Sequence, residues 1–155
     1  METLSETLGH ASEEAEKALE HLKNCVEELG TKAEELCKQH FELVMAGNKQ
    51  KSWSDKSVLF VQTRVRGYSL TANWYEIRWY GSKSAKTRRM TKRLIPKQKG
   101  SYGYNLAVLG KLAQPWEMDV IEAIEPKLSE IRRRVYLVNK AIASLNHVLR
   151  IDQPK

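Results

Sequence analysis

The chain has 155 residues and a formal net charge of +7, and 41% of its residues are hydrophobic. This length favours a single domain over 1–155 with its own core, and the hydrophobic content argues against disorder. No apolar run approaches the roughly 18 residues that cross a bilayer, and the acidic, polar residues 1–15 do not resemble a signal peptide. We therefore expect a cytoplasmic protein that makes no membrane contact.

Charge is divided unevenly along the chain. Residues 1–47 contain eleven acidic and four basic residues, a net charge of −7, whereas residues 49–99 contain fourteen basic and two acidic residues, a net charge of +12. Such a division is typical of a protein with one element for shielding or partner contact and another that meets nucleic acid or a different polyanion.

The acidic segment 1–47 is predicted to form one long helix. Its apolar and small residues recur at alternating spacings of four and three, which indicates a heptad seam. The seam consists of Leu4, Leu8, Ala11, Ala15, Ala18, Leu22, Cys25, Leu29, Ala33, Leu36, His40 and Leu43. Gly30 suits a helix end, and Thr31 with Glu34 would make a capping box, so a break at this point is an open alternative.

The basic segment 57–96 is predicted to form an antiparallel sheet. Residues 58–66 and 70–80 alternate with period two, are rich in Val, Trp and Tyr, and are separated by a loop short enough for a hairpin. We expect Leu59, Val61 and Val65 of the first strand to face the core with Tyr75, Ile77 and Trp79 of the second. Residues 87–95 carry charge on both faces, which favours an edge strand or an extended arm.

The last part of the chain, residues 104–151, is predicted to be helical. A short helix at about 104–113 precedes Pro115, which suits the first turn of a final long helix, and Pro126 could kink that helix. Its apolar residues Val120, Ile124, Leu128, Ile131, Val135, Val138, Ile142, Leu145 and Leu149 again recur at spacings of three and four. We expect at least one of Arg132, Arg133 and Arg134 to pair with an acid of the N-terminal helix.

Together these elements predict an α+β fold in which long N- and C-terminal helices, forming a coiled-coil-like stalk, flank a three-stranded antiparallel sheet. The two apolar stripes have to be covered, either by each other in an antiparallel pair or by a second subunit. A homodimer is our expectation.

Catalytic and metal-binding signatures are not found in the sequence. It has no Gly-rich phosphate loop, no HExxH motif and no GxSxG motif. His21, Cys25, Cys37 and His40 are residue types that zinc accepts, but positions 21 and 40 of one helix lie roughly 28 Å apart. We therefore expect no enzymatic activity, no cofactor and no metal, and reduced cysteines that serve in packing.

The basic sheet is the strongest functional signal, because phosphate binding needs several Lys or Arg on one surface. Arg also reads guanine edges, and a two-stranded ribbon fits a groove of the duplex. Exposed Trp74 and Tyr80 could instead stack on unpaired bases. The simplest alternative is a basic edge that only keeps the sheet soluble. The predicted nucleic-acid-binding residues are Arg64, Arg66, Trp74, Arg78, Lys83, Lys86, Arg88, Arg89, Lys92, Arg93, Lys97 and Lys99.

Several short motifs taken together resemble one family. They are WYEIRWY at 74–80, LIPK at 94–97, Tyr104, Trp116-Glu117, Glu125 and Ile131-Arg132. Over roughly residues 53–135 the chain resembles the MobI-type conjugative transfer proteins. The resemblance implies an auxiliary factor for mobilising a conjugative element, a DNA-binding helper that acts at the origin of transfer with a relaxase. The resemblance implies no catalytic residues for this chain.

The sequence thus predicts a non-enzymatic protein that binds double-stranded DNA and assists a relaxase or another transfer protein. Two alternatives stay open. One is a binder of RNA or single-stranded nucleic acid, which the Trp and Tyr content permits. The other is a coiled-coil interaction module whose sheet is structural and binds no nucleic acid.

Overall fold

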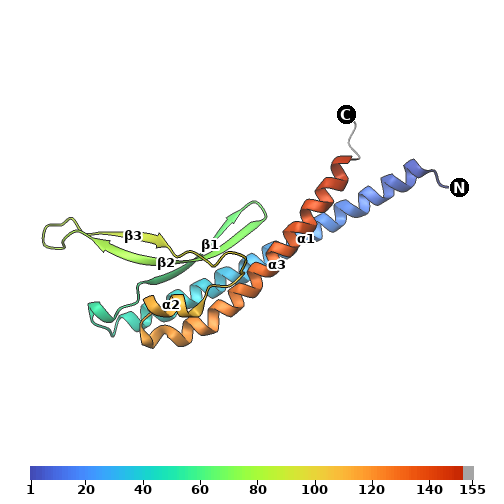
Figure 1. Ribbon diagram of the computed structural model, residues 1–155. Helices are drawn as coiled ribbons and strands as arrows, with labels where there is room; N and C mark the ends of the chain where they lie inside the picture. The colour runs from blue at the N-terminus through green and yellow to red at the C-terminus, as the bar shows by residue number, and fades with distance from the viewer. Residues whose placement is uncertain (152–155) are drawn as a thin grey trace.

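The computed structural model describes residues 1–151. Three α-helices, three strands and two short 3-10 helices follow one another along this part of the chain (Figure 1). In order they are α1 (Leu4–Asn48), η1 (Trp53–Asp55), β1 (Leu59–Arg66), β2 (Ser69–Tyr80), β3 (Arg89–Leu94), α2 (Leu106–Leu112), η2 (Pro115–Glu117) and α3 (Met118–Ile151). The predicted α+β class with long terminal helices flanking a three-stranded antiparallel sheet is confirmed.

The stalk consists of α1 and α3, which lie side by side, with the start of α1 and the end of α3 at the same end of the molecule (Figure 1). The two apolar stripes therefore cover each other within one chain, since antiparallel helices bury facing seams. The buried side of α1 differs from the predicted seam. Leu36 and His40 are buried as expected, but the predicted seam residues Leu4, Leu8 and Leu43 are exposed, and the buried positions include Leu19, Val26 and Val44 instead.

Both helices pass through residues that could have interrupted them. α1 is continuous across Gly30, which is buried, and Thr31 Oγ1 donates a 3.0 Å hydrogen bond back to the Glu27 carbonyl instead of capping a new helix. The capping box lies at the start of α1, between Thr3 and Glu6. α3 continues through Pro126. No helix within residues 1–151 combines the length and apolar character needed to span a membrane.

The sheet has the strand order β1-β2-β3, and both pairings are antiparallel. Arg66 pairs with Ser69, so the first hairpin turns over two residues, and Gly67 there has a φ of +58° that suits glycine. β2 is the longest strand and pairs with β1 along one edge and with β3 along the other. β3 is the predicted edge strand.

The face of β2 that meets the helices is the opposite of the predicted one. Leu59 and Val61 are buried as expected, but they pair with Glu76 and Trp74, and Trp74 is fully buried. Trp79 is exposed, and so is Val65 near the hairpin tip. Since β2 carries aromatic residues on both faces, alternation alone could not identify the face that packs on α1 and α3.

We name the two sides of the sheet after neighbouring residues of β2. The Trp74 face supplies buried residues to the core, namely Leu59, Val61, Leu70, Ala72 and Trp74. The Tyr75 face carries Phe60, Gln62, Arg64, Arg66, Tyr75, Ile77, Trp79, Met90, Lys92 and Leu94. The core lies between the Trp74 face and the two stalk helices.

Candidate nucleic-acid interface

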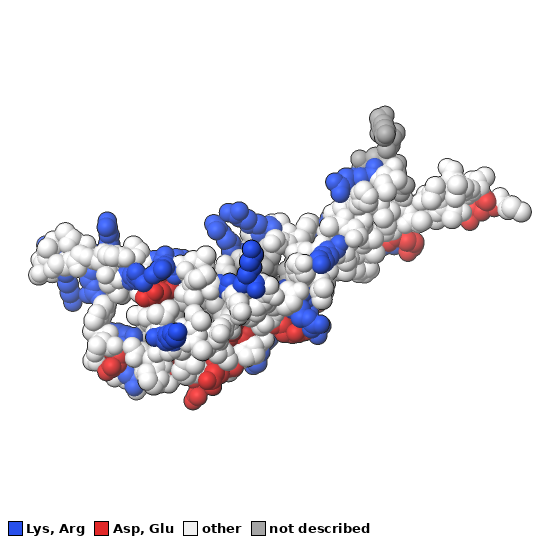
Figure 2. Space-filling model, in the orientation of Figure 1, with Lys and Arg blue, Asp and Glu red and all other residues white. Residues whose placement is uncertain are grey.

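Eleven of the twelve predicted binding residues have side chains that solvent reaches, and Trp74 is the exception. Because Trp74 has 0% exposure, the expectation that it stacks on bases from the surface is wrong. Figure 2 shows Lys and Arg gathered over the sheet and its hairpins, whereas most Asp and Glu visible in this view lie along the helices. The charge division along the sequence is thus also a division in space.

The end of β2, the start of β3 and the loop between them form a projecting arm, which we define as residues 78–93 (Figure 1). Alternate residues of β3 point to opposite faces. Arg89 and Arg93 lie on the Trp74 face, opposite Tyr80 and Glu76, while Lys92 lies on the Tyr75 face, opposite Ile77. The arm therefore presents cations on both sides, as the poor alternation of this segment predicted.

The arm loop is closed by a tight approach of two backbone segments. Gly81 has a φ of +81°, and a Cβ atom placed on it would lie 2.3 Å from the carbonyl oxygen of Thr87. The Thr87 amide in turn donates to the Ser82 carbonyl at 3.0 Å. Only glycine fits this position, because any other residue would combine a left-handed backbone with a steric overlap.

The loop brings Arg88 against two tryptophans. Its guanidinium carbon lies 3.9 Å from the centre of the Trp53 ring and 4.5 Å from that of Trp79. The two rings are themselves 5.6 Å apart between centres. Stacking of this kind suits Arg, whose planar cation is more weakly hydrated than the ammonium of Lys.

Beside this stack the Tyr75 face is hollowed into a groove of about 660 Å³, which we call the aromatic groove. Its lining comes from α1, η1 and all three strands: Phe41, Met45, Asn48, Lys49, Trp53, Lys56, Ser57, Val58, Phe60, Ile77, Trp79, Met90 and Lys92. Most of the exposed lining is apolar, yet no acidic residue contributes to it. An apolar surface of this extent on the outside of a domain marks an interaction site.

The wall of the groove that carries Trp53 is held in place by hydrogen bonds from distant parts of the chain. Trp116 Nε1 donates to the Asp55 carbonyl at 2.8 Å, and Gln114 Nε2 donates to the Ser54 carbonyl at 3.1 Å. At the end of α1, Asn48 Oδ1 accepts from the Ser57 amide at 2.8 Å. The groove is therefore largely formed before any ligand binds.

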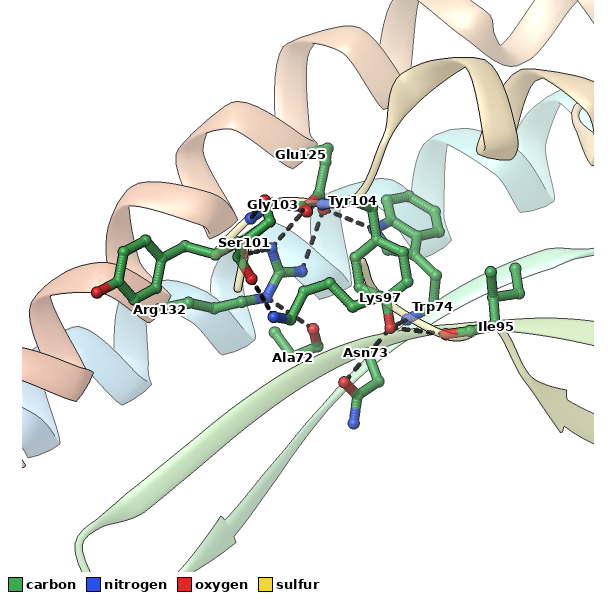
Figure 3. A network of polar contacts seen from close by, with 11 residues as sticks. Ala72, Asn73, Trp74, Ile95, Lys97, Ser101, Gly103, Tyr104, Glu125 and Arg132 are labelled. Carbon is green, nitrogen blue, oxygen red and sulfur yellow. Dashed lines mark hydrogen bonds and ion pairs between the residues drawn. The ribbon is translucent and has the colours of Figure 1, made fainter. Parts of the chain in front are cut away.

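A buried ion pair fastens the sheet to α3 (Figure 3). Arg132 Nη1 and Nη2 donate to the two oxygens of Glu125 at 2.7 and 3.1 Å, and Arg132 Nε donates to the Ala72 carbonyl of β2 at 2.9 Å. Glu125 also accepts from Trp74 Nε1 at 2.6 Å and from the Tyr104 amide at 2.7 Å. A bidentate, fully satisfied pair of this kind specifies one arrangement of its partners.

The same network holds the segment that follows β3. Tyr104 OH donates to the Ile95 carbonyl at 3.0 Å and accepts from the Trp74 amide at 3.3 Å. Burial raises the pKa of this phenol, which therefore stays protonated and able to donate. Lys97 Nζ donates to the Ser101 carbonyl (Figure 3), so this predicted binding residue is already engaged within its own loop.

The arginines of α3 do not find the partner predicted for them. Arg132 pairs with Glu125, and Arg134 pairs with Glu130 at 2.8 Å, so both partners belong to α3 itself. The acids of α1 that form ion pairs do so with lysines of the same helix, as in Lys17–Glu14 and Lys32–Glu35. The expected pairing with an acid of the N-terminal helix is wrong, because Arg134 meets an acid one turn earlier on its own helix and Arg132 meets a buried acid two turns earlier on the same face.

Two further titratable groups are buried beside the sheet. His40 packs edge-on against Trp74 with 4.9 Å between ring centres, and burial lowers its pKa from 6.5 to about 4. Glu117 accepts from Ser57 Oγ at 2.9 Å, and its pKa is raised, chiefly by burial. Both lie in the protein core and serve packing rather than the surface.

Sequence reasoning missed the aromatic half of the interface. Trp53 drew no prediction, and Phe60 and Trp79 were counted as neither binding residues nor surface residues. The sequence did hold a signal for this aromatic surface. Trp53 stands between Lys51 and Lys56, and Trp79 is followed by Arg88 nine residues later. Conversely, several residues that support the family resemblance lie inside the protein, namely Trp74, Tyr104, Glu117, Glu125 and Arg132.

Comparison with models of known protein families gives a match over most of the chain. A family model described as MobI protein matches residues 29–146, which include the second half of α1, the whole sheet and most of α3. No curated protein and no solved structure matches the chain.

Proposed function

The chain belongs to the MobI family, whose role is that of an accessory in conjugative mobilisation, and we propose that it acts as a DNA-binding, non-enzymatic factor that assists a relaxase near an origin of transfer. The observation that supports DNA binding best is the arm, which carries exposed cations on both faces of an edge strand. Double-stranded DNA is the partner that this arrangement favours, since a two-stranded ribbon with arginines on one side and a lysine on the other can lie in a groove between two phosphate backbones.

Two sets of cations would contribute in this mechanism. Arg78, Arg89 and Arg93 belong to the arm, whereas Arg64 and Arg66 stand beside the first hairpin on the Tyr75 face. The cations of both hairpins engage phosphates, and the arginines can in addition read guanine edges. The buried pair of Arg132 with Glu125 keeps the sheet fixed on the stalk, so that the two hairpins present their cations at a constant separation.

The stalk supplies surfaces for protein partners. The outer side of α1 is acidic, which discourages the stalk from lying on DNA and offers a docking face to a basic patch of a relaxase or another transfer protein. At the free end of the stalk Leu4, Leu8, Val148 and Ile151 are exposed. A second copy that covers these apolar side chains would complete the homodimer that we propose.

The proposed function is tested with three variants that each remove two positive charges. Arg89→Gln with Arg93→Gln changes the arm, Arg64→Gln with Arg66→Gln changes the first hairpin, and Arg133→Gln with Arg134→Gln is the control on α3. Binding to duplex fragments of the host element is measured by fluorescence anisotropy at several salt concentrations. Each lost phosphate contact should reduce the slope of log affinity against log salt by about 0.9, so the arm variant should lose about 2.

The control variant should bind like the wild type apart from a small effect of net charge. DNA binding by the arm is excluded if the arm variant matches the control in both affinity and salt slope. No binding of any nucleic acid at about 0.15 M salt by the wild type would favour the coiled-coil interaction module instead.

A further inference from the structure

We propose that the aromatic groove binds a short single-stranded DNA segment, with unpaired bases stacked on Trp53 and Trp79 and phosphates held by Arg88, Lys56 and Lys92. This inference rests on the proposed function and assigns a ligand class to the surface where Trp79, Arg88 and Lys92 of the arm meet Trp53 of η1. It concerns the Tyr75 face of the sheet, whereas Arg89 and Arg93 belong to the opposite face.

The first support is the set of aromatic rings that remain open to solvent. Trp53 is 57% exposed and Trp79 is 47% exposed, although both are among the largest apolar side chains of the protein. Trp53 is held by a segment that Trp116 and Gln114 fix, so its ring is in place before a ligand arrives. Exposed, rigid indole rings are the usual platforms for unpaired bases, since every base has a π face.

The second support is the position of the cations relative to these rings. Arg88 lies over both tryptophans, Lys56 Nζ lies 5.7 Å from the centre of the Trp53 ring, and Lys92 Nζ lies 5.1 Å from that of Tyr75. A nucleotide chain alternates apolar bases with anionic phosphates, and its spacing is similar to the distances between these rings and cations. Rings with cations at their faces match that alternation, as in grooves that track single strands.

The third support is the charge of the lining. Lys49, Lys56 and Lys92 line the groove and no acidic residue does, although acids are frequent on the adjoining helix α1. A single strand supplies both of the groups that this lining matches, bases for the apolar floor and phosphates for the basic rim. The volume of about 660 Å³ lies within the roughly 300–1,000 Å³ of small-ligand sites.

The test compares three probes of equal length: a 12-nucleotide oligo(dT), a 12-unit abasic oligonucleotide with the same phosphates, and a 12-base-pair duplex. Affinity is measured by anisotropy, and stacking is followed by quenching of Trp fluorescence. The variants are Trp53→Ala with Trp79→Ala, and Trp53→Phe with Trp79→Phe, which keeps aromatic rings. Both tryptophans are largely exposed, so the fold should survive, and an unchanged urea unfolding midpoint checks that it does.

We expect the wild type to bind oligo(dT) at least tenfold more tightly than the abasic probe, with quenching on binding. The Ala variant should lose this preference, and the Phe variant should recover most of it. Equal affinity for oligo(dT) and the abasic probe, with duplex binding intact, would overturn the inference and leave the proposed function standing. Failure to bind any of the three probes would overturn both. If the Ala variant keeps wild-type binding of oligo(dT) but loses a relaxase, the groove is a protein-docking site.

Discussion

Trp74 Nε1 donates a 2.6 Å hydrogen bond to Glu125 Oε2, and this contact joins the centre of β2 to α3 deep inside the protein. The bond explains how a tryptophan that looks like a surface residue in the sequence can be buried completely, since its only polar atom has an anionic acceptor there. It also places the arm and the aromatic groove on one rigid support, because Glu125 is held in turn by Arg132.

Removing Arg132 should destabilise the fold strongly. Arg132→Leu leaves the buried carboxylate of Glu125 without its cation, which typically costs about 3–5 kcal/mol of the free energy of unfolding. The double variant Arg132→Leu with Glu125→Leu should recover part of this loss, because the uncompensated charge is gone. Urea denaturation measures the free energy of unfolding of the single and the double variant. The control Arg134→Leu removes an exposed arginine of the same helix and should change stability little. A loss for Arg132→Leu no larger than that of Arg134→Leu would contradict the role of the pair.

His40 should make stability depend on pH. Burial lowers its folded-state pKa to about 4, below the unfolded value of 6.5, so the unfolded chain binds the proton first as pH falls. The stabilisation is fully present above pH 6.5 and is lost toward pH 4, by about 3 kcal/mol over this range. His40→Leu should flatten that part of the stability curve.

The contribution of Glu117 to the pH dependence of stability has the opposite sign to that of His40, and it does not obscure this comparison. Its pKa is raised, chiefly by burial, so its contribution is present below about pH 4.5 and is lost as pH rises through the folded-state pKa. Wild type and His40→Leu share Glu117, and the difference between their curves therefore isolates His40. Parallel curves for the two proteins would show that His40 does not titrate as expected.

Gly81 should tolerate substitution less well than Gly67. Both have positive φ, at +81° and +58°, so alanine at either site incurs backbone strain of about 1–3 kcal/mol. At Gly67 the new Cβ meets nothing within 4 Å, whereas at Gly81 it meets the Thr87 carbonyl oxygen at 2.3 Å. Gly81→Ala should therefore lose more stability in urea denaturation and should also displace Arg88 from the two tryptophans. Equal losses for the two variants would mean that the arm loop relaxes without cost.

The two cysteines should differ in reactivity. Burial raises the pKa of the Cys37 thiol to about 11, and the thiolate is the reactive form. Cys25 is only half-buried. In the native protein at pH 8, an alkylating reagent should modify Cys25 well before Cys37, as peptide mass spectrometry would show. A Cys25→Ser variant should resist the reagent until denaturant is added, and rapid labelling of Cys37 in that variant would contradict its burial.

The stalk end offers a test of the proposed dimer. Leu4→Glu with Leu8→Glu places charges on the exposed apolar end of α1, and sedimentation should then give the mass of one chain where the wild type gives two. Val65→Glu, at an equally exposed site on β1, should leave the dimer intact. A wild type that sediments as a single chain at all concentrations would rule out the dimer.

Much of the fold could be predicted because its signals are local. The seam of the long helices, the alternation of β1 and the short hairpin loop depend on residues close in the sequence, and the predicted element order is confirmed. The predicted division into an acidic helix, a basic sheet and terminal helices within a single domain remains a prediction. The DNA-binding roles of the basic residues also remain predictions.

By itself the sequence determined the order of the elements, the charge division and the basic arm, since periodicity and composition follow from neighbouring residues. Only the tertiary structure decided which face of β2 is buried. β2 has Trp74 on one face and Tyr75, Ile77 and Trp79 on the other, so both faces are apolar enough to pack. The choice depends on Glu125, which lies 51 residues away in the sequence, accepts from the Trp74 indole only in the folded chain and is held there by Arg132. That choice leaves Trp79 outside with Trp53 and Arg88, and it is the reason the aromatic groove exists.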